Sequence, residues 1–358
     1  MNNTLGNTFR ITSFGESHGS HVGVVIDGCP PNIALDYKHI QDLLDKRKPG
    51  QTAISTERKE EDVFEIISGV LEKKTTGHPI TILIKNKDQK GKDYDALKDV
   101  YRPSHADYTY EKKYQIRDYK GGGRASARVT AGWVAAGAIA LQVLAKDTDI
   151  EVAAYVSQIY DISIGQKPNK ETLSKRYDSI TRCPNESTSA KMEEAILQAK
   201  EDGDSLGGII SCVIKKVPVG LGDPVFSKLN ANLGHAMLSI NAVKGFEFGA
   251  GFSSAGEKGS AMNDAFTQEG ERTKTKTNHS GGIQGGISNG MPIEFRVAFK
   301  PTATISSEQA TVNKAGDNIK LEAQGRHDPC VVPRAVPIVE AMAALVLVDH
   351  FLYQKMMH

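Results

Sequence analysis

Apolar residues recur along this chain at the spacing of amphipathic helices in two segments, residues 35–47 and residues 187–202. The first ends in a Pro-Gly pair and the second begins with Ser and Thr residues that can cap a helix, so both predict ordinary amphipathic helices. Residues 129–145 and 335–352 are instead apolar around nearly their whole circumference. Helices of that kind are usually buried on more than one side, and we expect these two to lie in the core.

Shorter apolar runs predict strands between these helices. They are residues 22–26, 80–84, 150–156, 209–217 and 293–299. The last run alternates apolar and polar positions and follows an Asn-Gly pair, which is the pattern of a strand entered from a hairpin turn. Because no linker divides the chain, we predict one domain over residues 1–358, with an α+β fold in which helices pack between antiparallel sheets.

The composition narrows the class of protein. The 358 residues include 44 Lys and Arg against 43 Asp and Glu, so the overall charge gives no reason to expect nucleic acid or an anionic membrane as a partner. Four cysteines, at 29, 183, 212 and 330, lie far apart and fit reduced thiols rather than a disulfide framework or a zinc site. Residues 1–15 are polar, and no apolar run looks long enough to span a bilayer. We therefore expect a soluble cytoplasmic protein.

The segment Gly121 to Arg128, which reads GGGRASAR, leads directly into the apolar helix predicted from residue 129. Glycine backbone lets a ligand approach closely, and the start of a helix offers unpaired N–H groups and the positive end of the helix dipole. The two arginines add positive charge. This combination predicts an anion-binding cradle.

Three short segments offer groups for proton transfer. His18 lies between glycines in GESHG, His105 lies near an arginine and two tyrosines in RPSHADYTY, and Asp328 follows a histidine in GRHDPC. The first two have plainer interpretations, a surface turn and a loop whose tyrosines pack on the core. A metal site formed by His279, His327 and Asp328 competes for the third, but these residues lack the spacing of metal ligands, and we expect no metal.

Other basic and glycine-rich segments extend the candidate site. Residues 46–50 place cations at a helix end, where the helix dipole alone favours them or where an arginine could hold a phosphate. Residues 241–245, 279–286 and 300–304 add amides, hydroxyls and bare backbone. Turns are the common use of such glycines, but together with the basic residues they point to a large, flat, multiply anionic ligand. Residues 249–278 are polar and charged, and we expect a mobile loop that orders over that ligand.

These segments resemble the chorismate synthase family, and the similarity runs through essentially the whole chain. The matching blocks are GESHG, RPSHADYTY, GGGRASAR, SGGIQGGISNG at residues 280–290 and GRHDPCVVPRAVPIVEAM at residues 325–342, in the order that the family has them. The resemblance implies a β-α-β sandwich, a homotetramer and a carbon–oxygen lyase that acts on phosphates. The implied reaction is the anti 1,4-elimination of phosphate from 5-enolpyruvylshikimate 3-phosphate to give chorismate, the last common step of the shikimate pathway to aromatic amino acids. Reduced FMN is the implied cofactor, although the reaction involves no net oxidation.

The resemblance also implies roles for individual residues. His18 matches the histidine thought to protonate the departing phosphate, and His105 matches the one thought to protonate the reduced flavin. Asp328 matches the aspartate proposed to assist the flavin N5 position in removing the ring proton.

Ligand contacts follow from the same comparison of motifs. Arg47 matches an arginine assigned to an anion or a pyridine nucleotide, and Ser17 and Arg128 are also expected to bind substrate anions. The FMN contacts of the family fall on Arg124, Ala125, Ser126, Asn241, Ala242, Gly285, Lys300, Pro301, Thr302, Ala303, Thr304 and Arg326.

The chain departs from the family pattern at several positions. Ala125 replaces a common Ser, so the backbone alone can contribute there, and Ser104 and Trp133 stand where Gly and Arg are frequent. Ala53 stands where the family often has Arg or Lys, which argues against NADPH binding. We therefore expect a monofunctional enzyme served by an external flavin reductant. Two other classes stay open: a flavin or nucleotide-phosphate binding protein without lyase activity, and a metal-dependent phosphohydrolase.

Overall fold

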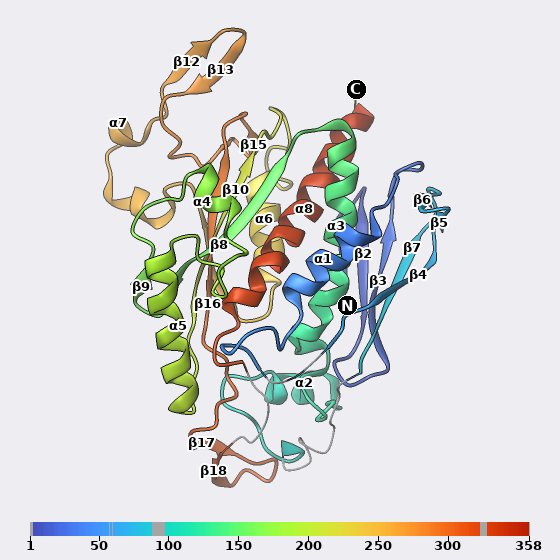
Figure 1. Cartoon of the computed structure of the whole chain (residues 1–358), viewed down its shortest axis with the longest axis vertical. Coiled ribbons are helices and arrows are strands. Elements are labelled where there is room, and N and C mark those ends of the chain that lie inside the picture. Colours follow the sequence, from blue (N-terminus) through green and yellow to red (C-terminus); the bar gives the residue numbers. More distant parts are fainter. Residues whose placement is uncertain (1–2, 57, 59, 88–96, 323–327, 358) are drawn as a thin grey trace.

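Two antiparallel sheets enclose a layer of helices in the computed structural model, which describes residues 3–56, 58, 60–87, 97–322 and 328–357 (Figure 1). The first sheet has the strand order β1-β2-β3-β7-β4 and the second has the order β11-β16-β10-β8-β9. The strands of the first sheet are β1 (Thr4–Leu5), β2 (Arg10–Gly15), β3 (His21–Asp27), β4 (Phe64–Ser68) and β7 (Ile80–Lys85). Those of the second are β8 (Glu151–Ile159), β9 (Ile162–Ser163), β10 (Gly208–Lys215), β11 (Val243–Phe248) and β16 (Ile293–Phe299). The predicted α+β sandwich is thus confirmed.

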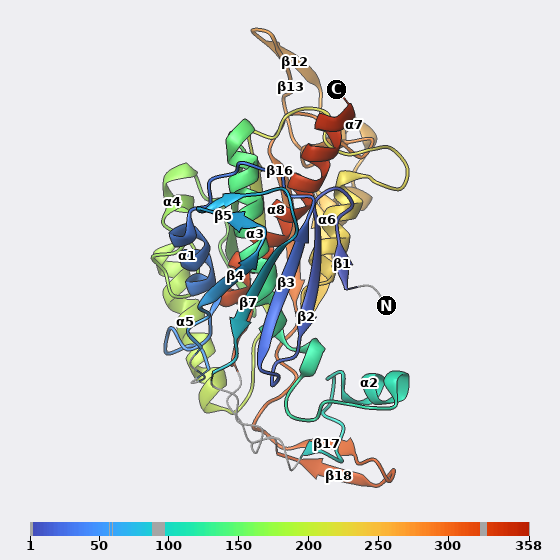
Figure 2. The same cartoon turned by 90° about the vertical axis from the view of Figure 1, so that its right-hand side faces the viewer.

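Helices fill the space between the sheets and cover their edges (Figures 1 and 2). The longer helices are α1 (Tyr37–Arg47), α2 (Asp107–Tyr114), α3 (Thr130–Asp147), α5 (Glu186–Glu201), α6 (Leu229–Leu238) and α8 (Val332–Met357). Short elements are α4 (Lys170–Ser174), α7 (Gly259–Met262), η2 (Gly123–Ala125), η3 (Ala127–Val129) and η4 (Gly251–Gly256). The remaining strands form small hairpins, β5 (Val70–Leu71) with β6 (Lys74–Thr75), β12 (Phe266–Glu269) with β13 (Arg272–Thr275), β14 (Ile283–Gln284) with β15 (Ile287–Ser288), and β17 (Gln309–Val312) with β18 (Asn318–Leu321).

The two all-apolar helices, α3 and α8, form the centre of the sandwich. They touch at Gly137, where an added Cβ would lie only 2.4 Å from the Cβ of Ala341. By length and composition the helical stretches 127–147 and 332–357 could each cross a membrane, so the expectation that no apolar run is long enough is wrong. Most of each stretch is buried inside the protein, 72% and 94% of the most apolar window, because the two sheets cover them. These are core helices, as their all-round apolar pattern predicts.

The ends of the amphipathic helices are set by side chains that cap them. The Asp36 carboxylate accepts a hydrogen bond from the His39 N–H at the start of α1, and the Asn185 amide oxygen accepts one from Thr188 N–H at the start of α5. The cap of α5 is therefore Asn185, two residues before the Ser and Thr that the sequence suggests. Asn is an equally good cap, since its side-chain oxygen reaches the same orphan N–H groups.

Strand β16 has the predicted bounds and alternation but not the predicted partner. Ile293, Phe295, Val297 and Phe299 are buried, as the pattern requires. The Asn289-Gly290 turn leads into this strand from β15, yet β15 pairs with β14, and β16 pairs with β10 and β11. Strand β16 thus joins the five-stranded sheet, where its apolar side chains are buried, instead of pairing with the strand just before the turn.

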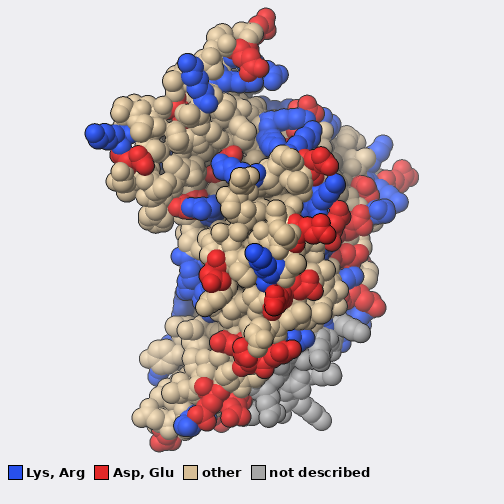
Figure 3. Space-filling model, turned by 60° about the vertical axis from the view of Figure 1, so that its left-hand side comes forward, with Lys and Arg blue, Asp and Glu red and all other residues tan. Residues whose placement is uncertain are grey.

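Residues 249–278 contain ordered elements where the sequence suggests a loop. They include η4, α7 and the β12–β13 hairpin, which projects from one end of the molecule (Figure 1). The Asp264 carboxylate closes the segment by accepting hydrogen bonds from the Thr277 hydroxyl and from the His279 and Ser280 N–H groups. Polar contacts of this kind order a segment without giving it an apolar periodicity. On the face shown in Figure 3, basic and acidic side chains are interspersed, as the balanced composition predicts.

Replacing Gly137 by alanine tests the close contact between α3 and α8. The added methyl group would lie 2.4 Å from the Cβ of Ala341 and 2.6 Å from its Cα, so the helix backbones would have to separate. Although alanine favours a helix, we expect the free energy of unfolding to fall by about 1–3 kcal/mol, the usual range for overpacking a core. Urea unfolding measures this. Gly256→Ala is the control because nothing lies within 4 Å of its Cβ position, and equal midpoints for the two variants would contradict the close packing.

Candidate active site

The loop that carries His18 joins β2 to β3 and packs directly on the glycine turn that precedes η2. A Cβ added at Gly121 would lie 2.3 Å from both Nδ1 and Cε1 of the His18 ring. Gly121 also has a φ of 118°, a conformation that residues with a side chain rarely adopt. Ser17 Oγ lies 3.0 Å from His18 Nδ1, and the Ser17 N–H donates to the Gly123 carbonyl. The predicted cradle and the first predicted imidazole are therefore in contact.

His105 reaches the same glycine turn through two neighbours. Its Nδ1 lies 2.9 Å from Oδ1 of Asp107, the first residue of α2. The same carboxylate accepts hydrogen bonds from the Arg102 guanidinium at 2.7 and 2.8 Å. Arg102 Nη2 then donates to the Gly121 carbonyl at 3.0 Å. Gly121 thus touches the His18 ring on one side and anchors the His105 cluster on the other.

The Asp107 carboxylate sets the state of the His105 ring. Burial by itself would raise the pKa of Asp107, but its hydrogen bonds with Arg102 and His105 hold that pKa well below its ordinary value. An ionised carboxylate can only accept, so Nδ1 of His105 carries the proton and Nε2 is the nitrogen left for a ligand. Burial lowers the pKa of His105 itself, a hydrogen bond with Asp107 opposes this, and the charge of Arg102 adds to it. His105 is therefore neutral at pH 7.

A cavity of about 720 Å³ lies beside this cluster. His105, the glycines 121–123 and Arg124 line it, together with the cationic side chains of Lys113 and Arg117. Its volume is within the range of cofactor and substrate sites in proteins. Arg124 is fixed there by donating to the carbonyls of Ser13 and Gly15, each at 3.0 Å. The cavity therefore joins an imidazole to positive charge and bare backbone.

The predicted flavin contacts on distant segments also meet. The Asn241 side-chain amide donates to the Ala125 carbonyl at 2.6 Å, and the Ala242 carbonyl accepts from the Lys300 N–H at 2.9 Å. Asn241 Oδ1 and Thr302 Oγ1 are buried and have no hydrogen-bond partner among the described residues. A buried polar atom without a partner is costly. These two atoms, both on predicted flavin contacts, therefore fit a ligand that supplies polar groups.

Asp328 lies next to the segment that carries Thr302. The Thr302 carbonyl accepts from the Ser205 hydroxyl at 2.8 Å, and the next residue, Leu206, donates its N–H to the Pro329 carbonyl at 2.8 Å. Asp328 is 9% exposed, and its carboxylate accepts from Thr56 N–H and from Arg334 Nη1 at 3.0 and 2.6 Å. The residues 300–304 and Asp328 are thus held together by one short bridge.

Arg47 and Arg128, the two arginines expected to bind substrate anions, are buried and paired with one carboxylate. Both are buried, at 0% and 3% exposure, and both guanidiniums pair with the carboxylate of Asp62. Arg47 also donates to the Ala127 carbonyl and the Thr130 hydroxyl. An internal carboxylate thus holds both arginines, and their contact with a substrate anion stays a prediction. Burial lowers the pKa of Arg47, while the charge of Asp62 opposes this shift.

Two predicted contacts are not placed with the rest. Gly285 is exposed at the turn of the β14–β15 hairpin, and Figure 1 shows β15 at the opposite end of the molecule from α2. Arg326 lies outside the described residues, as does His327 of the metal interpretation. Among the described residues, no group of three or more His, Cys, Asp or Glu side chains could hold a metal ion.

The departures from the family pattern have local explanations at two positions. Ser104 has a φ of 55°, in the region that favours glycine, which is the residue frequent there in the family. Ala53 contributes its carbonyl to Lys200 Nζ of α5 at 3.2 Å. A cation from a different element therefore lies at this position.

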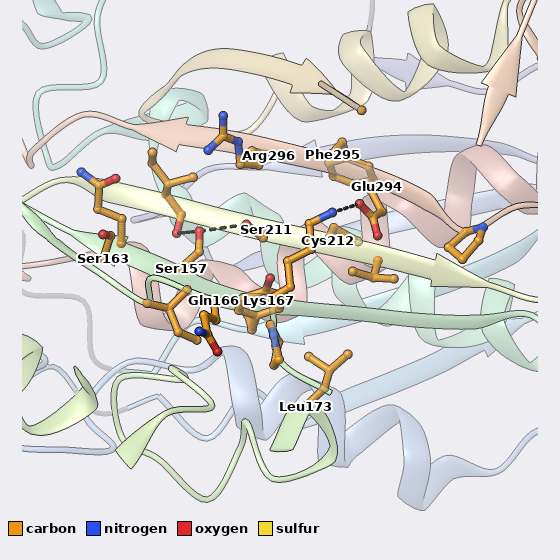
Figure 4. Close-up of a pocket in the computed structure, with 18 of the residues that line it drawn as sticks. Ser157, Ser163, Gln166, Lys167, Leu173, Ser211, Cys212, Glu294, Phe295 and Arg296 are labelled. Carbon is orange, nitrogen blue, oxygen red and sulfur yellow. Dashed lines mark hydrogen bonds and ion pairs between the residues drawn. The ribbon is translucent and has the colours of Figure 1, made fainter. Parts of the chain in front are cut away.

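A second cavity, of about 570 Å³, lies on the outer face of the second sheet and contains none of the predicted site residues (Figure 4). The Ser211 hydroxyl donates to Ser157 Oγ at 2.8 Å on its floor. Of the three cationic residues that line it, Lys167 pairs with Glu294 and Arg296 pairs with Glu247, and Lys215 is the third. For an anionic ligand, the cavity beside His105 is the better candidate.

Sequence reasoning missed the groups that hold the site together. Asp62 belongs to a run of charged residues that looks like a solvated face, but it is 2% exposed. Asn86 follows the buried strand β7 and is 4% exposed. The position of Asn86, a polar residue directly after an apolar strand, could have predicted a structural role. No pattern in the sequence around Asp62 predicts that it is buried.

Fold and site together define an α+β sandwich protein with a glycine-lined cavity beside His105 and next to the His18 loop. A family model for chorismate synthase matches residues 9–352. The chain is 55% identical over 356 residues to the chorismate synthase of Cytophaga hutchinsonii, covering 99% of both chains. It is 56% identical over 353 residues to that of a Synechocystis species, covering 98% of both. A crystal structure of chorismate synthase superposes with a TM-score of 0.78 at 31% identity, covering 98% of this chain and 93% of that one. This chain belongs to the chorismate synthase family.

Gly121→Ala should disable the site while leaving the fold intact. The new Cβ would lie 2.3 Å from the His18 ring and would occupy a strained backbone conformation. We expect turnover to fall at least ~10²-fold, because small displacements of reacting groups have costs of that size. Chorismate formation and circular dichroism measure the two effects. Gly270→Ala is the control, since its φ is also positive, at 61°, but nothing lies within 4 Å. Equal turnover of the two variants would contradict the contact.

Proposed function

We propose that this chain catalyses the anti 1,4-elimination of phosphate from 5-enolpyruvylshikimate 3-phosphate to give chorismate, with reduced FMN as cofactor. Membership of the chorismate synthase family supports the reaction. The observation that carries it here is that the two imidazole-bearing segments converge on Gly121. The His18 ring lies where a Cβ of Gly121 would be, and His105 is linked to the Gly121 carbonyl through Asp107 and Arg102. The substrate carries two carboxylates and a phosphate, which the cationic cavity suits.

The residues present fit a flavin phosphate and ring. We propose that the Ala125 backbone, Asn241, Ala242 and residues 300–304 hold the cofactor. Hydrogen bonds join these segments, and two of their buried oxygens have no hydrogen-bond partner among the described residues. Arg124 and Ser126 lie on either side of Ala125 in the chain, directly after the glycine turn. Reduced FMN, when bound, supplies an electron-rich ring that stabilises the allylic centre as phosphate leaves.

The side chains have distinct proposed tasks. His18, with Ser17 at its Nδ1, donates a proton to the departing phosphate. His105, held by Asp107, presents Nε2 to the cavity and moves a proton at the flavin. Asp328 takes part in removing the ring proton. An anionic ligand in the cavity would oppose the lowering of the His105 pKa by burial, so binding favours its acid form.

We further propose a cytoplasmic homotetramer supplied with reduced flavin by a separate reductant. The four cysteines are buried thiols, which supports a reducing compartment. The remote position of the Gly285 turn supports an assembly, because a second copy could bring this turn to the cavity. Comparing NADPH alone with chemically reduced FMN in an anaerobic assay tests the source of reduced flavin.

The variants His18→Ala and His105→Ala test the proton-transfer roles. Each should still bind FMN and substrate, while turnover falls ~10²–10⁴-fold, the typical contribution of general acid–base catalysis. Release of phosphate and formation of chorismate under anaerobic conditions with reduced FMN are the measurements. Full turnover by either variant would reject its role. Flavin binding without phosphate release by the unaltered protein would favour a binding protein, and loss of activity with a chelator would favour a metal-dependent hydrolase.

The pH dependence gives a separate test of His105. Burial lowers its pKa below 6.5 in the free protein, so its acid form is lost at a lower pH than that of an ordinary histidine. We expect kcat/KM to fall as the pH rises through that lowered value, and kcat to fall only at higher pH. His105→Gln should abolish this limb of the kcat/KM profile. A profile unchanged in the variant would assign the limb to another group.

A further inference from the structure

We propose that Asn86 is a positioning residue that fixes the loop carrying His18, and that the buried Asp62 carboxylate holds Asn86 in place through Arg128. This inference rests on the proposed function, because it assigns the loop geometry to the reacting imidazole. Neither Asn86 nor Asp62 lies in the motifs that identify the family.

Asn86 directs its side-chain NH₂ and its backbone N–H to this loop. Its side-chain amide donates to the carbonyls of Glu16 and Gly19, at 3.0 and 2.7 Å. Its backbone N–H donates to the Ser20 carbonyl at 3.0 Å. The two side-chain bonds span the loop from one side of His18 to the other. Asn86 therefore determines how far the His18 ring stands from Gly121.

The Asn86 side chain is itself held by a buried arginine. Arg128 Nε donates to Asn86 Oδ1 at 2.7 Å, and Arg128 Nη2 donates to the Lys85 carbonyl at 3.1 Å. With its oxygen engaged in this way, the Asn86 amide has one orientation, NH₂ toward the loop. Arg128 lies in η3, the short turn that leads into α3. The start of the core helix therefore fixes the orientation of the Asn86 amide.

Asp62 provides the charge that keeps Arg128 there. One carboxylate oxygen pairs with Arg128 and the other accepts from Arg47 Nη1 at 2.6 Å. Both Asp62 oxygens are enclosed, and the residue has a φ of 51°, an unusual backbone state for a residue with a side chain. Glu60 lies 3.9 Å from Arg128 and adds a second negative charge. Two guanidiniums buried without such partners would be strongly unfavourable. A continuous series of ion pairs and hydrogen bonds through the buried side chains of Asp62, Arg128 and Asn86 thus leads to the loop.

Asn86→Asp isolates the positioning role. The substitution keeps the size of the side chain and an oxygen for Arg128, but it replaces two donors by a carboxylate oxygen that faces two carbonyls. We expect kcat to fall ~10–100-fold, the cost of a small displacement of a reacting group, while KM and FMN affinity change less than about threefold. Hydrogen exchange of the amides of residues 16–20 should become faster, and the melting temperature should change little.

Asn232→Asp is the matched control. The Asn232 amide lies 2.9 Å from His350 Nε2 and bridges α6 to α8, away from the His18 loop. This variant should keep the turnover and loop exchange of the unaltered protein. Equal losses of kcat in the two variants, or a kcat within twofold of the unaltered protein for Asn86→Asp, would overturn the positioning role.

Asn86→Ser provides the test if the aspartate variant does not fold. Its hydroxyl can donate to one carbonyl, so turnover and loop exchange should lie between those of the unaltered protein and of a protein lacking both bonds. Values equal to the unaltered protein would overturn the inference. Hydrogen exchange needs no turnover, so a wild-type protein that forms no chorismate would refute the proposed function while the loop measurement still decides the role of Asn86.

Discussion

Gly121 has no side chain, and this allows the His18 ring to lie against its backbone while its carbonyl accepts a hydrogen bond from Arg102. The rest of the site is arranged around that turn. The His18 loop comes from the first sheet, the His105 cluster from the start of α2, and the cradle from the residues leading into α3. A side chain at this point would separate the two imidazole-bearing segments, so the chemistry depends on a missing Cβ.

The two central helices connect the glycine turn to the core of the fold. Helix α3 begins a few residues after the glycine turn and runs between the sheets against α8, with Gly137 packed on Ala341. Helix α8 in turn begins just after Asp328, and its Asp349 carboxylate accepts from the N–H groups of Asn7, Thr8 and Phe9. The candidate catalytic groups thus stand at the ends of rigid core elements. Precise placement of this kind is what proton transfer requires.

Ion pairs buried beneath the site also stabilise its geometry. Arginines that face a ligand and arginines that pair with an internal carboxylate look the same in a sequence, since both are charged and follow helix ends. Asp62 separates the two cases here by pairing with Arg47 and Arg128. Arg124 and Arg117 remain at the wall of the cavity. Arg117 is itself paired with Asp107, so carboxylates hold arginines both at the cavity wall and in the core beneath it.

Local pattern accounts for much of what the sequence could predict. The all-round apolar helices, the alternation of β16 and the glycine cradle each depend on neighbouring residues, so their spacing reveals them. The motifs also singled out His18, His105, Ala125 and Asn241, because the residue types were distinctive. The hydrogen bond between Asn241 and Ala125 was found only in the structure.

What the sequence by itself determined was the class of fold, the core helices and the chemistry available at each motif. The tertiary structure alone decided which strands pair, that β16 joins β10 and β11, and that Asp62 and Asn86 support the site. The physical reason is that pairing and burial depend on residues far apart in the chain. Asp62 and Arg128 are 66 positions apart, so no local period records their contact.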